Sequence, residues 1–274
     1  MAAVSVRTSS SSTKGRGARA GRLVAGLGLA AIAVAGFTGS AAFAAEAPVP
    51  MGTAAEYSVL GASTVTNTNV TNLAGSVGVS PGSAITGFPP GIVAGATHAA
   101  DAQALQAQAD ALIAYTNASG RTFTSTGLVD LGGLTLLPGA WDTGGVIGLT
   151  GTLTLDALGN PDAVFIFKSL STLITAPSSS VSLTNGAQAC NVWWVVPTSA
   201  TLDTDSSFVG TIMASESISV NNGVTVQGRA LALNAAVTLD GDTFTSAECA
   251  APTPSPSPGP SDSASADSLP DTGS

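Results

Sequence analysis

Between Gly144 and Asp242, short stretches alternate apolar residues with threonine or serine and end at Gly, Asn or Asp. This period of two places Leu, Ile and Val on one face of a strand and small hydroxyl side chains on the other. Gly, Asn and Asp turn the chain at low steric cost, and they recur about every six to ten residues. The pattern predicts many short strands without helices between them, as in a wound parallel stack, a sandwich or a barrel.

The strands fall into three groups that recur in the same order along the chain. The strongly apolar segments are 164–168, 192–196, 211–214 and 229–233. The alternating hydroxyl strands that follow them are 172–174, 201–203, 217–220 and 236–239, with 152–155 assigned to the same set. The third group comprises 180–184, 207–209, 225–227 and 243–245. Three faces per turn of about 18 to 28 residues predict a parallel β-solenoid of roughly triangular cross-section.

Residues 98 to about 117 break the β pattern and predict the one long α-helix. The apolar residues that share one helical face are Ala102, Leu105, Ala109, Leu112 and Ile113. We expect this face to pack on the strands and Thr97 to cap the helix start. A helix of this size, about 30 Å long, matches about six β layers spaced 4.8 Å apart, so it can run alongside the stack.

The N-terminus has the features of a secretory signal peptide, which we expect to cover residues 1–45. Its basic residues are Arg7, Lys14, Arg16, Arg19 and Arg22. An apolar segment at 23–37 and the Ala42-Phe43-Ala44 cleavage pattern follow, so cleavage is expected near Ala44 or Ala45. The mature protein is therefore expected to be secreted, with a domain spanning residues 46–250.

Removal of this segment leaves three basic residues against 17 acidic ones, a formal charge of −14. Nucleic acids and anionic membranes bind clusters of basic residues. The mature sequence has no such cluster, which excludes both as partners. Nor does it have an HxH, HExxH or Cys/His motif, and His98, the only histidine, is interpreted as a helix-start residue. We expect no metal and no other cofactor.

The two cysteines, Cys190 and Cys249, favour a single disulfide in an exported chain. Steady winding between them climbs about three layers of 4.8 Å, which is too far for a bridge unless the chain end folds back. Residues 251–274 are expected to form an extended Pro/Ser-rich spacer. Its last part, Leu269-Pro270-Asp271-Thr272-Gly273, resembles the LPxTG signal that sortases join to peptidoglycan, so the mature protein is a candidate for cell-wall attachment.

Two other classes of function compete for this architecture. A polysaccharide lyase on a parallel β-helix needs an acidic metal cluster and a basic catalytic residue, and the strands supply neither. The chain also contains no Cys–His pair, so we expect no enzyme. A cell-surface adhesin or carbohydrate-binding solenoid would use exposed aromatic residues, for which Trp141, Trp193 and Trp194 are the candidates.

Six stretches carry a resemblance to a known family. They are GSVGVSPGSAITGFPPG (75–91), HAADAQALQAQADALIAY (98–115), LPGAW (137–141), DAVFIFK (162–168), NGAQACNVWW (185–194) and VQGRALALNAAVTLD (226–240). From about Tyr57 to Cys249 the chain resembles the secreted ice-binding proteins. The resemblance implies a right-handed β-solenoid with a long helix packed alongside and a flat face that binds ice and inhibits ice growth and recrystallisation. We expect a monomer with the ice surface as its partner.

The residues of this chain that match such a face carry mostly small hydroxyl groups. They are Thr64, Thr66, Thr152, Thr154, Thr172, Ile174, Thr201, Ser217, Ser219 and Thr238. β-Branched Thr has restricted rotamers, so an array of Thr presents methyl and hydroxyl groups at fixed repeats that can order water. Ile174 departs from a pure hydroxyl face. Asp203 places a carboxylate at its edge, which argues against very strong activity.

Overall fold

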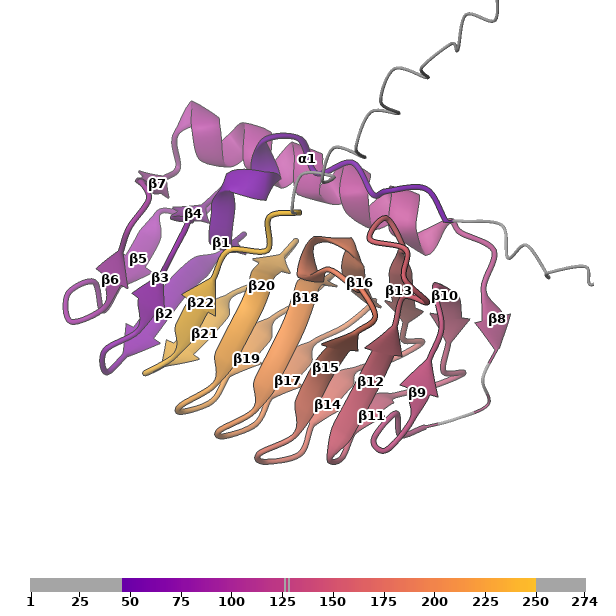
Figure 1. The fold of residues 1–274 in the computed structure, drawn as a ribbon. Helices are drawn as coiled ribbons and strands as arrows, with labels where there is room; N and C mark the ends of the chain where they lie inside the picture. Colours follow the sequence, from indigo (N-terminus) through magenta and orange to yellow (C-terminus); the bar gives the residue numbers. More distant parts are fainter. Residues whose placement is uncertain (1–45, 126, 128, 250–274) are drawn as a thin grey trace, which may run out of the picture. The chain divides into compact units, whose positions relative to one another are not determined.

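The computed structural model describes residues 46–125, 127 and 129–249. The expected signal peptide and the spacer with its LPxTG-like motif lie outside these residues. The described domain is a β-solenoid in which parallel strands stack into three faces around an apolar interior, and one helix lies along one face (Figure 1). This agrees with the predicted fold class.

One face of the solenoid lies under the helix, and the strands in its middle are buried on both sides. Its strands are β1 (Tyr57–Gly61), β4 (Ser76–Val79), β7 (Thr97–Ala99), β8 (Thr124–Ser125), β10 (Gly139–Asp142), β13 (Phe165–Lys168), β16 (Val192–Val196) and the C-terminal halves of β18 (Ser207–Ala214) and β20 (Thr225–Ala232). Two 3-10 helices, η1 (Gly52–Glu56) and η2 (Ala189–Asn191), precede β1 and β16.

The second face is a separate seven-stranded parallel sheet. Its order is β11 (Ile147–Leu149), β14 (Leu173–Thr175), β17 (Ala200–Leu202), β19 (Ile218–Val220), β21 (Val237–Asp240), β2 (Thr64–Thr68) and β5 (Ala84–Thr86). The third face comprises β9 (Thr135–Leu136), β12 (Thr152–Asp156), β15 (Ser180–Thr184), the N-terminal halves of β18 and β20, β22 (Thr243–Thr245), β3 (Asn72–Leu73) and β6 (Ile92–Val93).

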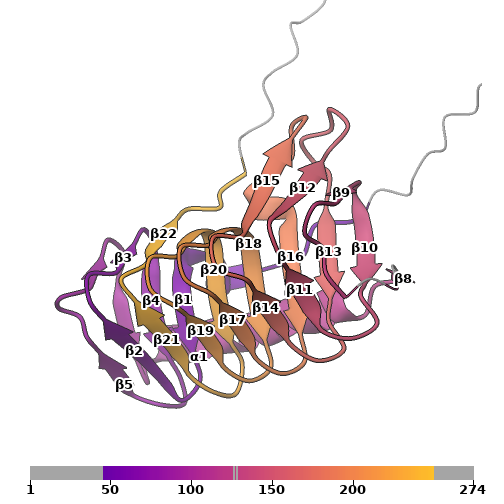
Figure 2. The ribbon, with the colours of Figure 1, turned by 90° about the horizontal axis from the view of Figure 1, so that it is seen from below.

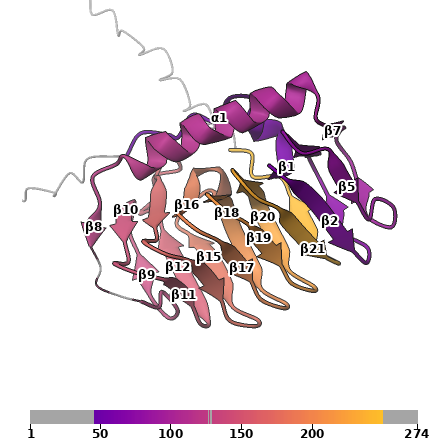
Figure 3. The same ribbon diagram turned by 180° about the vertical axis from the view of Figure 1, so that it is seen from behind.

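The coils do not stack in sequence order. The N-terminal coils lie against the C-terminal coil, with β2 paired to β21, β1 to β20 and β3 to β22. In Figure 3 the yellow strand β21 accordingly lies between the orange β19 and the indigo β2. Helix α1 (Ala102–Ser119) then carries the chain along the stack from the β7 end to the β8 end (Figure 1).

Helix α1 packs through a different face from the predicted one. The buried residues are alanines, namely Ala104, Ala107, Ala111, Ala114 and Ala118. Leu105, Leu112 and Ile113 are instead more than half exposed, at 62, 55 and 57%. The opposing strands supply large side chains, among them Trp193 and Leu231, so only a methyl group fits on the helix side. The N-cap is Asp101, whose carboxylate accepts from the Ala104 N–H at 2.8 Å, and not Thr97.

The packing of α1 predicts different effects of two neighbouring substitutions on the free energy of unfolding. Ala111→Leu adds three carbons to a closed contact, and we expect it to lower the free energy of unfolding by about 1–3 kcal/mol. Leu112→Ala, on the neighbouring exposed position, is the matched control and should change it by less than about 0.5 kcal/mol. Urea titration followed by circular dichroism measures both values. A larger loss in Leu112→Ala than in Ala111→Leu would contradict the observed helix orientation.

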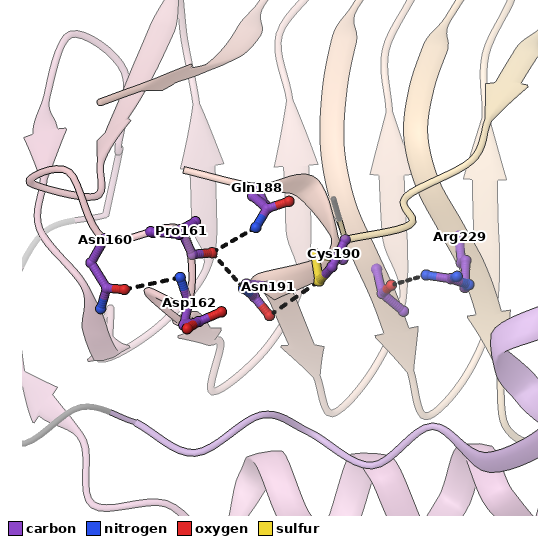
Figure 4. The surroundings of a disulfide bond; sticks show 9 residues. Asn160, Pro161, Asp162, Gln188, Cys190, Asn191 and Arg229 are labelled. Carbon is purple, nitrogen blue, oxygen red and sulfur yellow. Dashed lines mark hydrogen bonds between the residues drawn. A yellow bond between two sulfur atoms is a disulfide. The ribbon is translucent and has the colours of Figure 1, made fainter. Parts of the chain in front are cut away.

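Cys190 and Cys249 form a disulfide, with their Cα atoms 5.3 Å apart. The chain end does fold back. After β22, residues 246–248 run beside Gly228 and Arg229 and cross toward η2 (Figures 1 and 4). The neighbourhood of Cys190 is tied to the preceding coil through the Pro161 carbonyl, which accepts from Gln188 Nε2 at 2.8 Å and from Asn191 Nδ2 at 3.2 Å (Figure 4).

The interior is filled by aliphatic side chains and a short aromatic stack. Trp194 lies between Phe167 and Phe208, with ring centroids 4.4 and 4.9 Å apart. Its Nε1 donates to the Val209 carbonyl at 2.9 Å, so the indole is buried without losing a hydrogen bond. Within the described residues, no helix combines the length and the apolar character that a membrane crossing requires.

Candidate functional site

The outer surface of the seven-stranded sheet presents one row of aligned residues. Strand pairing places equivalent positions directly above one another, without a register shift. The row runs Gly148, Ile174, Thr201, Ser219, Thr238, Thr66 and Thr86. Five consecutive strands, from β17 to β5, thus each place a hydroxyl in it. Figure 3 shows these strands side by side.

A second row runs along the side of the sheet that adjoins the helix-covered face. It contains Thr172, Ser199, Ser217, Ala236, Thr64 and Ala84. Hydroxyls of adjacent coils touch in both rows, since Ser199 Oγ lies 3.0 Å from Ser217 Oγ and Thr66 Oγ1 lies 3.4 Å from Thr238 Oγ1. The inward residues of the same strands, such as Val65, Ile218 and Val237, are fully buried, which holds the strands in place.

The β11 end of the sheet has a different composition. Gly148 has no side chain, and Ile174 is 48% exposed with no hydroxyl. Val146, next to them, is also exposed. In the aligned row, hydroxyl groups therefore occur only on the five strands from β17 to β5. We call these five strands the hydroxyl array.

Carboxylates at the edge of the sheet are held by amides on neighbouring coils. Asp203 accepts from the Thr204 N–H at 2.8 Å and from Asn221 Nδ2 at 3.0 Å. The Asn221 bond, followed by the Thr204 bond, lowers the pKa of Asp203, so it stays ionised at neutral pH. Asp240 accepts from Asn69 Nδ2 at 2.6 Å. These hydrogen bonds hold both carboxylates at the edge of the sheet, beside the hydroxyl rows.

The assignment of Thr152 and Thr154 to this surface is wrong. Both lie in β12 on the third face, where they are in register with Ser180 and Ser182. The alternating pattern runs without interruption through both β11 and β12, and the corner between them falls at Gly151, which has φ +85°. The strand of this coil on the seven-stranded sheet is β11, which carries no hydroxyl in the aligned row.

The other eight residues named from the sequence do lie on the seven-stranded sheet or at its edge. Thr86 and Ser199, which complete the two rows, were missed. Thr86 follows Ala84 and Ile85 in a three-residue alternation that a search of the N-terminal segment for the same pattern would have found. Ser199 comes one residue before its strand begins.

The third face also carries hydroxyls but does not form one flat sheet. β12 and β15 share five paired positions, whereas β15 and β18 share only Ser180 with Ser207. Beyond that pair the strands diverge, and Figure 2 shows β12 and β15 splayed away from β18. This break separates the hydroxyls of β12 and β15 from those of the later coils.

The basic side chains of the described residues all lie away from the hydroxyl array. Arg121 binds Glu46 at 3.2 Å and the Ala47 carbonyl at 3.0 Å, which fastens the N-terminal segment along the helix. Lys168 lies over the ring of Phe123, 4.9 Å from its centroid. Arg229 Nε donates to the Ala55 carbonyl at 2.9 Å. The array therefore has no cation among the described residues.

No group of His, Cys, Asp and Glu side chains in the described part of the chain could hold a metal ion. His98 Nδ1 lies 2.7 Å from the Asp101 carboxylate, and its ring lies 5.7 Å from that of Tyr57. His98 thus supports the residue that caps the helix and is remote from the hydroxyl array.

A buried carboxylate lies at the corner between the seven-stranded sheet and the third face. Asp242 has no exposed surface, and burial raises its pKa to about 7, although its oxygens accept from the Asp240 N–H at 2.8 Å and the Val224 N–H at 3.2 Å. In the unfolded chain an aspartate has a pKa of about 3.9. Between about pH 4 and pH 7, Asp242 is therefore protonated in the folded protein and ionised in the unfolded chain.

We therefore expect the free energy of unfolding to fall as the pH rises from about 4 to 7, by at most about 4 kcal/mol, and then to level off. The carboxylates with lowered pKa values, such as Asp203, act in the opposite direction but only below about pH 4. Urea titrations between pH 4.5 and 8 measure the slope, and Asp242→Asn should remove it. An unchanged slope in Asp242→Asn would exclude Asp242 as its source.

The sequence and the structure of this chain match known proteins over most of the described residues. Residues 59–245 match a family described as Ice-binding-like. The chain belongs to this family. It is 46% identical over 220 residues to an ice-binding protein of Nostoc sp. (strain HG1), covering 79% of this chain and 81% of that relative. It is 33% identical to an ice-binding protein of a Colwellia species, covering 77% of this chain and 88% of that protein.

Solved structures of ice-binding proteins share the fold. One, from an Antarctic biological consortium, superposes with a TM-score of 0.72 at 43% identity and covers 73% of this chain and 92% of its own. Another, from the Antarctic ascomycete Antarctomyces psychrotrophicus, has a TM-score of 0.70 at 37% identity, with coverage of 73 and 98%. The resemblance drawn from the sequence motifs is confirmed.

Proposed function

We propose that this ice-binding-like protein binds ice through the hydroxyl array of the seven-stranded sheet and thereby inhibits ice growth and recrystallisation. The observation that carries the proposal is the unbroken row Thr201, Ser219, Thr238, Thr66 and Thr86 on five strands in register. Family membership supports ice as the ligand, and the geometry of the row supports this surface as the site.

The physical basis is the fixed spacing of small groups on a rigid support. Adjacent strands place the hydroxyls about 4.8 Å apart, and residues two positions apart along a strand are about 6.7 Å apart. Each hydroxyl and methyl contact with ordered water is weak. The strands are held by a buried core, so many such contacts form together with little loss of conformational entropy on binding. Strongly hydrated cations, which would disturb ordered water, are kept off the array.

The test is ice recrystallisation in a frozen sucrose solution that contains micromolar protein. We expect small crystals to persist, with no difference after addition of EDTA, because the proposed site uses no metal. Normal coarsening, with circular dichroism showing a folded β protein, would reject the function. A strong loss with EDTA would reject the cofactor-free site.

The setting of the protein is also part of the proposal. We propose that residues 1–45 direct export, that the mature protein is a monomer without catalytic activity, and that Leu269–Gly273 serve for covalent attachment to peptidoglycan. Wall attachment predicts release of the native protein by peptidoglycan digestion but not by high salt. Release of the protein by high salt alone would contradict covalent attachment and would be consistent with secretion only.

A further inference from the structure

The hydroxyl array is assembled from two segments that are far apart in the sequence. β17, β19 and β21 come from residues 200–240, whereas β2 and β5 come from residues 64–86. They meet at one junction, where Thr66 pairs with Thr238 and Thr68 with Asp240. Strands such as β19 and β21 are joined by one coil of the chain, which includes β20, whereas β21 and β2 are not consecutive in the chain. Something else has to fix their register.

A buried hydrogen-bond network crosses this junction. The Asp242 N–H donates to Thr71 Oγ1 at 3.0 Å, and Thr71 Oγ1 donates to Asn67 Oδ1 at 2.5 Å. Asn67 Nδ2 then donates to the Gly87 carbonyl at 2.9 Å. Asp242 and Thr71 are fully buried and Asn67 is 9% exposed, so water does not replace these partners.

The network spans four successive coils. The Asp242 carboxylate accepts from Val224 on the coil before it, and its backbone bonds to Thr71 on the coil after it. The Asp242 carbonyl also accepts from the Asn72 N–H at 2.8 Å. Asn67 extends the chain of bonds to Gly87 on the last N-terminal coil. One set of side chains therefore links the final coil of the C-terminal segment to both N-terminal coils.

The same corner is built differently elsewhere in the stack. The residues that precede the first strand position of the third face are Ser179, Ser206, Val224, Asp242 and Thr71. Ser179 and Ser206 lie 3.4 Å apart and join coils that are already close in sequence. Among these corner residues only Asp242 carries a carboxylate, and it lies at the junction of the two segments.

A register slip at this junction would have a specific cost. Moving β2 by one residue along β21 would turn its hydroxyls inward and its valine outward. The slip would also separate Thr71 Oγ1 from the Asp242 N–H, which leaves buried polar groups without partners. Because Asp242 and Thr71 bond only in the observed register, and Asn67 holds the Thr71 hydroxyl in place, the network selects this register.

We propose that Asp242, Thr71 and Asn67 are positioning residues that hold the N-terminal strands in register with the C-terminal strands, so that two segments form one ice-binding array. The inference rests on the proposed function, since its readout includes ice activity. The residues of this proposal do not contact ice, and the pattern of surface residues does not identify them.

The test uses the full secreted protein with Thr71→Val, which keeps the shape and removes the hydroxyl. At 4 °C we expect an unchanged far-ultraviolet spectrum but about tenfold faster amide hydrogen exchange in β2 and β5, with β17 and β19 unchanged. The concentration needed to inhibit recrystallisation should rise about tenfold. Thr71→Ser, which retains the hydroxyl, should restore both values. Ser179→Ala, at the equivalent corner outside the array, is the matched control and should leave ice activity intact.

The outcomes separate the two proposals. Equal exchange and equal ice activity in Thr71→Val and wild type would overturn the positioning role. If the wild type itself has no ice activity, the proposed function fails, and the exchange pattern still decides whether the network docks β2 and β5. Should Thr71→Val not fold, Asn67→Ala removes the link to Gly87 and the acceptor of the Thr71 hydroxyl, and it keeps the bond between Asp242 and Thr71. It is then expected to increase exchange in β5, and a lack of increase would count against the proposal.

Discussion

Replacing Thr238 and Thr66 together by tyrosine is expected to abolish ice activity while leaving the fold intact. The two residues are paired at the centre of the hydroxyl array, on adjacent strands. A tyrosine ring rises well above the level of a threonine methyl group, so it keeps neighbouring hydroxyls from a flat ice plane. We expect each single change to raise the concentration needed for recrystallisation inhibition about tenfold and the double change to remove inhibition at any soluble concentration.

Both threonines point outward from strands whose inward residues carry the packing, so the free energy of unfolding should change by less than about 0.5 kcal/mol for each substitution. The matched control is Thr225→Tyr with Thr243→Tyr, a pair of registered threonines on the third face, one on the coil of β21 and one on the coil before it. We expect the control to keep its activity. Loss in the third-face pair together with activity in the Thr66 and Thr238 pair would move the ice-binding site to the third face.

Removing the disulfide is expected to produce the largest loss of stability. Cys190 and Cys249 close a loop over a sequence separation of 59 residues. The loop-entropy treatment gives a loss of about 4 kcal/mol in the free energy of unfolding when such a link is removed. For a domain of this size, that corresponds to a fall in the midpoint of thermal unfolding of about 10 °C.

The variant to measure is Cys190→Ala with Cys249→Ala, followed by circular dichroism during heating. Ice activity at 4 °C should be retained, because neither cysteine lies on the seven-stranded sheet. A fall of less than about 3 °C would show that the link contributes little beyond the packing of the chain end. Loss of ice activity in a variant that is still folded at 4 °C would instead connect the disulfide to the array.

The strand pattern of this protein could be predicted because the alternation of apolar and hydroxyl residues directly reflects burial. The C-terminal coils have the three segments per turn that their sequence indicates. The alternation did not locate corners, as β11 and β12 show. One alternating run covers two faces there, and only the backbone at Gly151 marks the bend.

The helix orientation could not be predicted from apolar spacing alone. Two faces of α1 are apolar, one of alanines and one with Leu105, Leu112 and Ile113. The choice between them depends on the large side chains of the opposing strands, such as Trp193, which lie about 80 residues away in the sequence. Burial of the larger residues would have required a wider gap between helix and sheet.

The stacking order of the coils could not be predicted from the sequence either. A chain that winds steadily would place residues 57–99 at one end of the stack and residues 225–245 at the other. The structure pairs them, because α1 carries the chain back along the solenoid before the remaining coils are built. This reversal also explains why the hydroxyl array is continuous across residues 172 positions apart, Thr66 and Thr238.

The most direct test of the central claim is adsorption of the protein to a single ice crystal. The fluorescently labelled protein is placed in solution around a growing ice hemisphere, beside the labelled Thr66→Tyr and Thr238→Tyr double variant. We predict that the wild-type label is incorporated into the ice on defined planes and that the double variant is excluded. Exclusion of the wild type, or equal incorporation of both proteins, would contradict ice binding through the hydroxyl array.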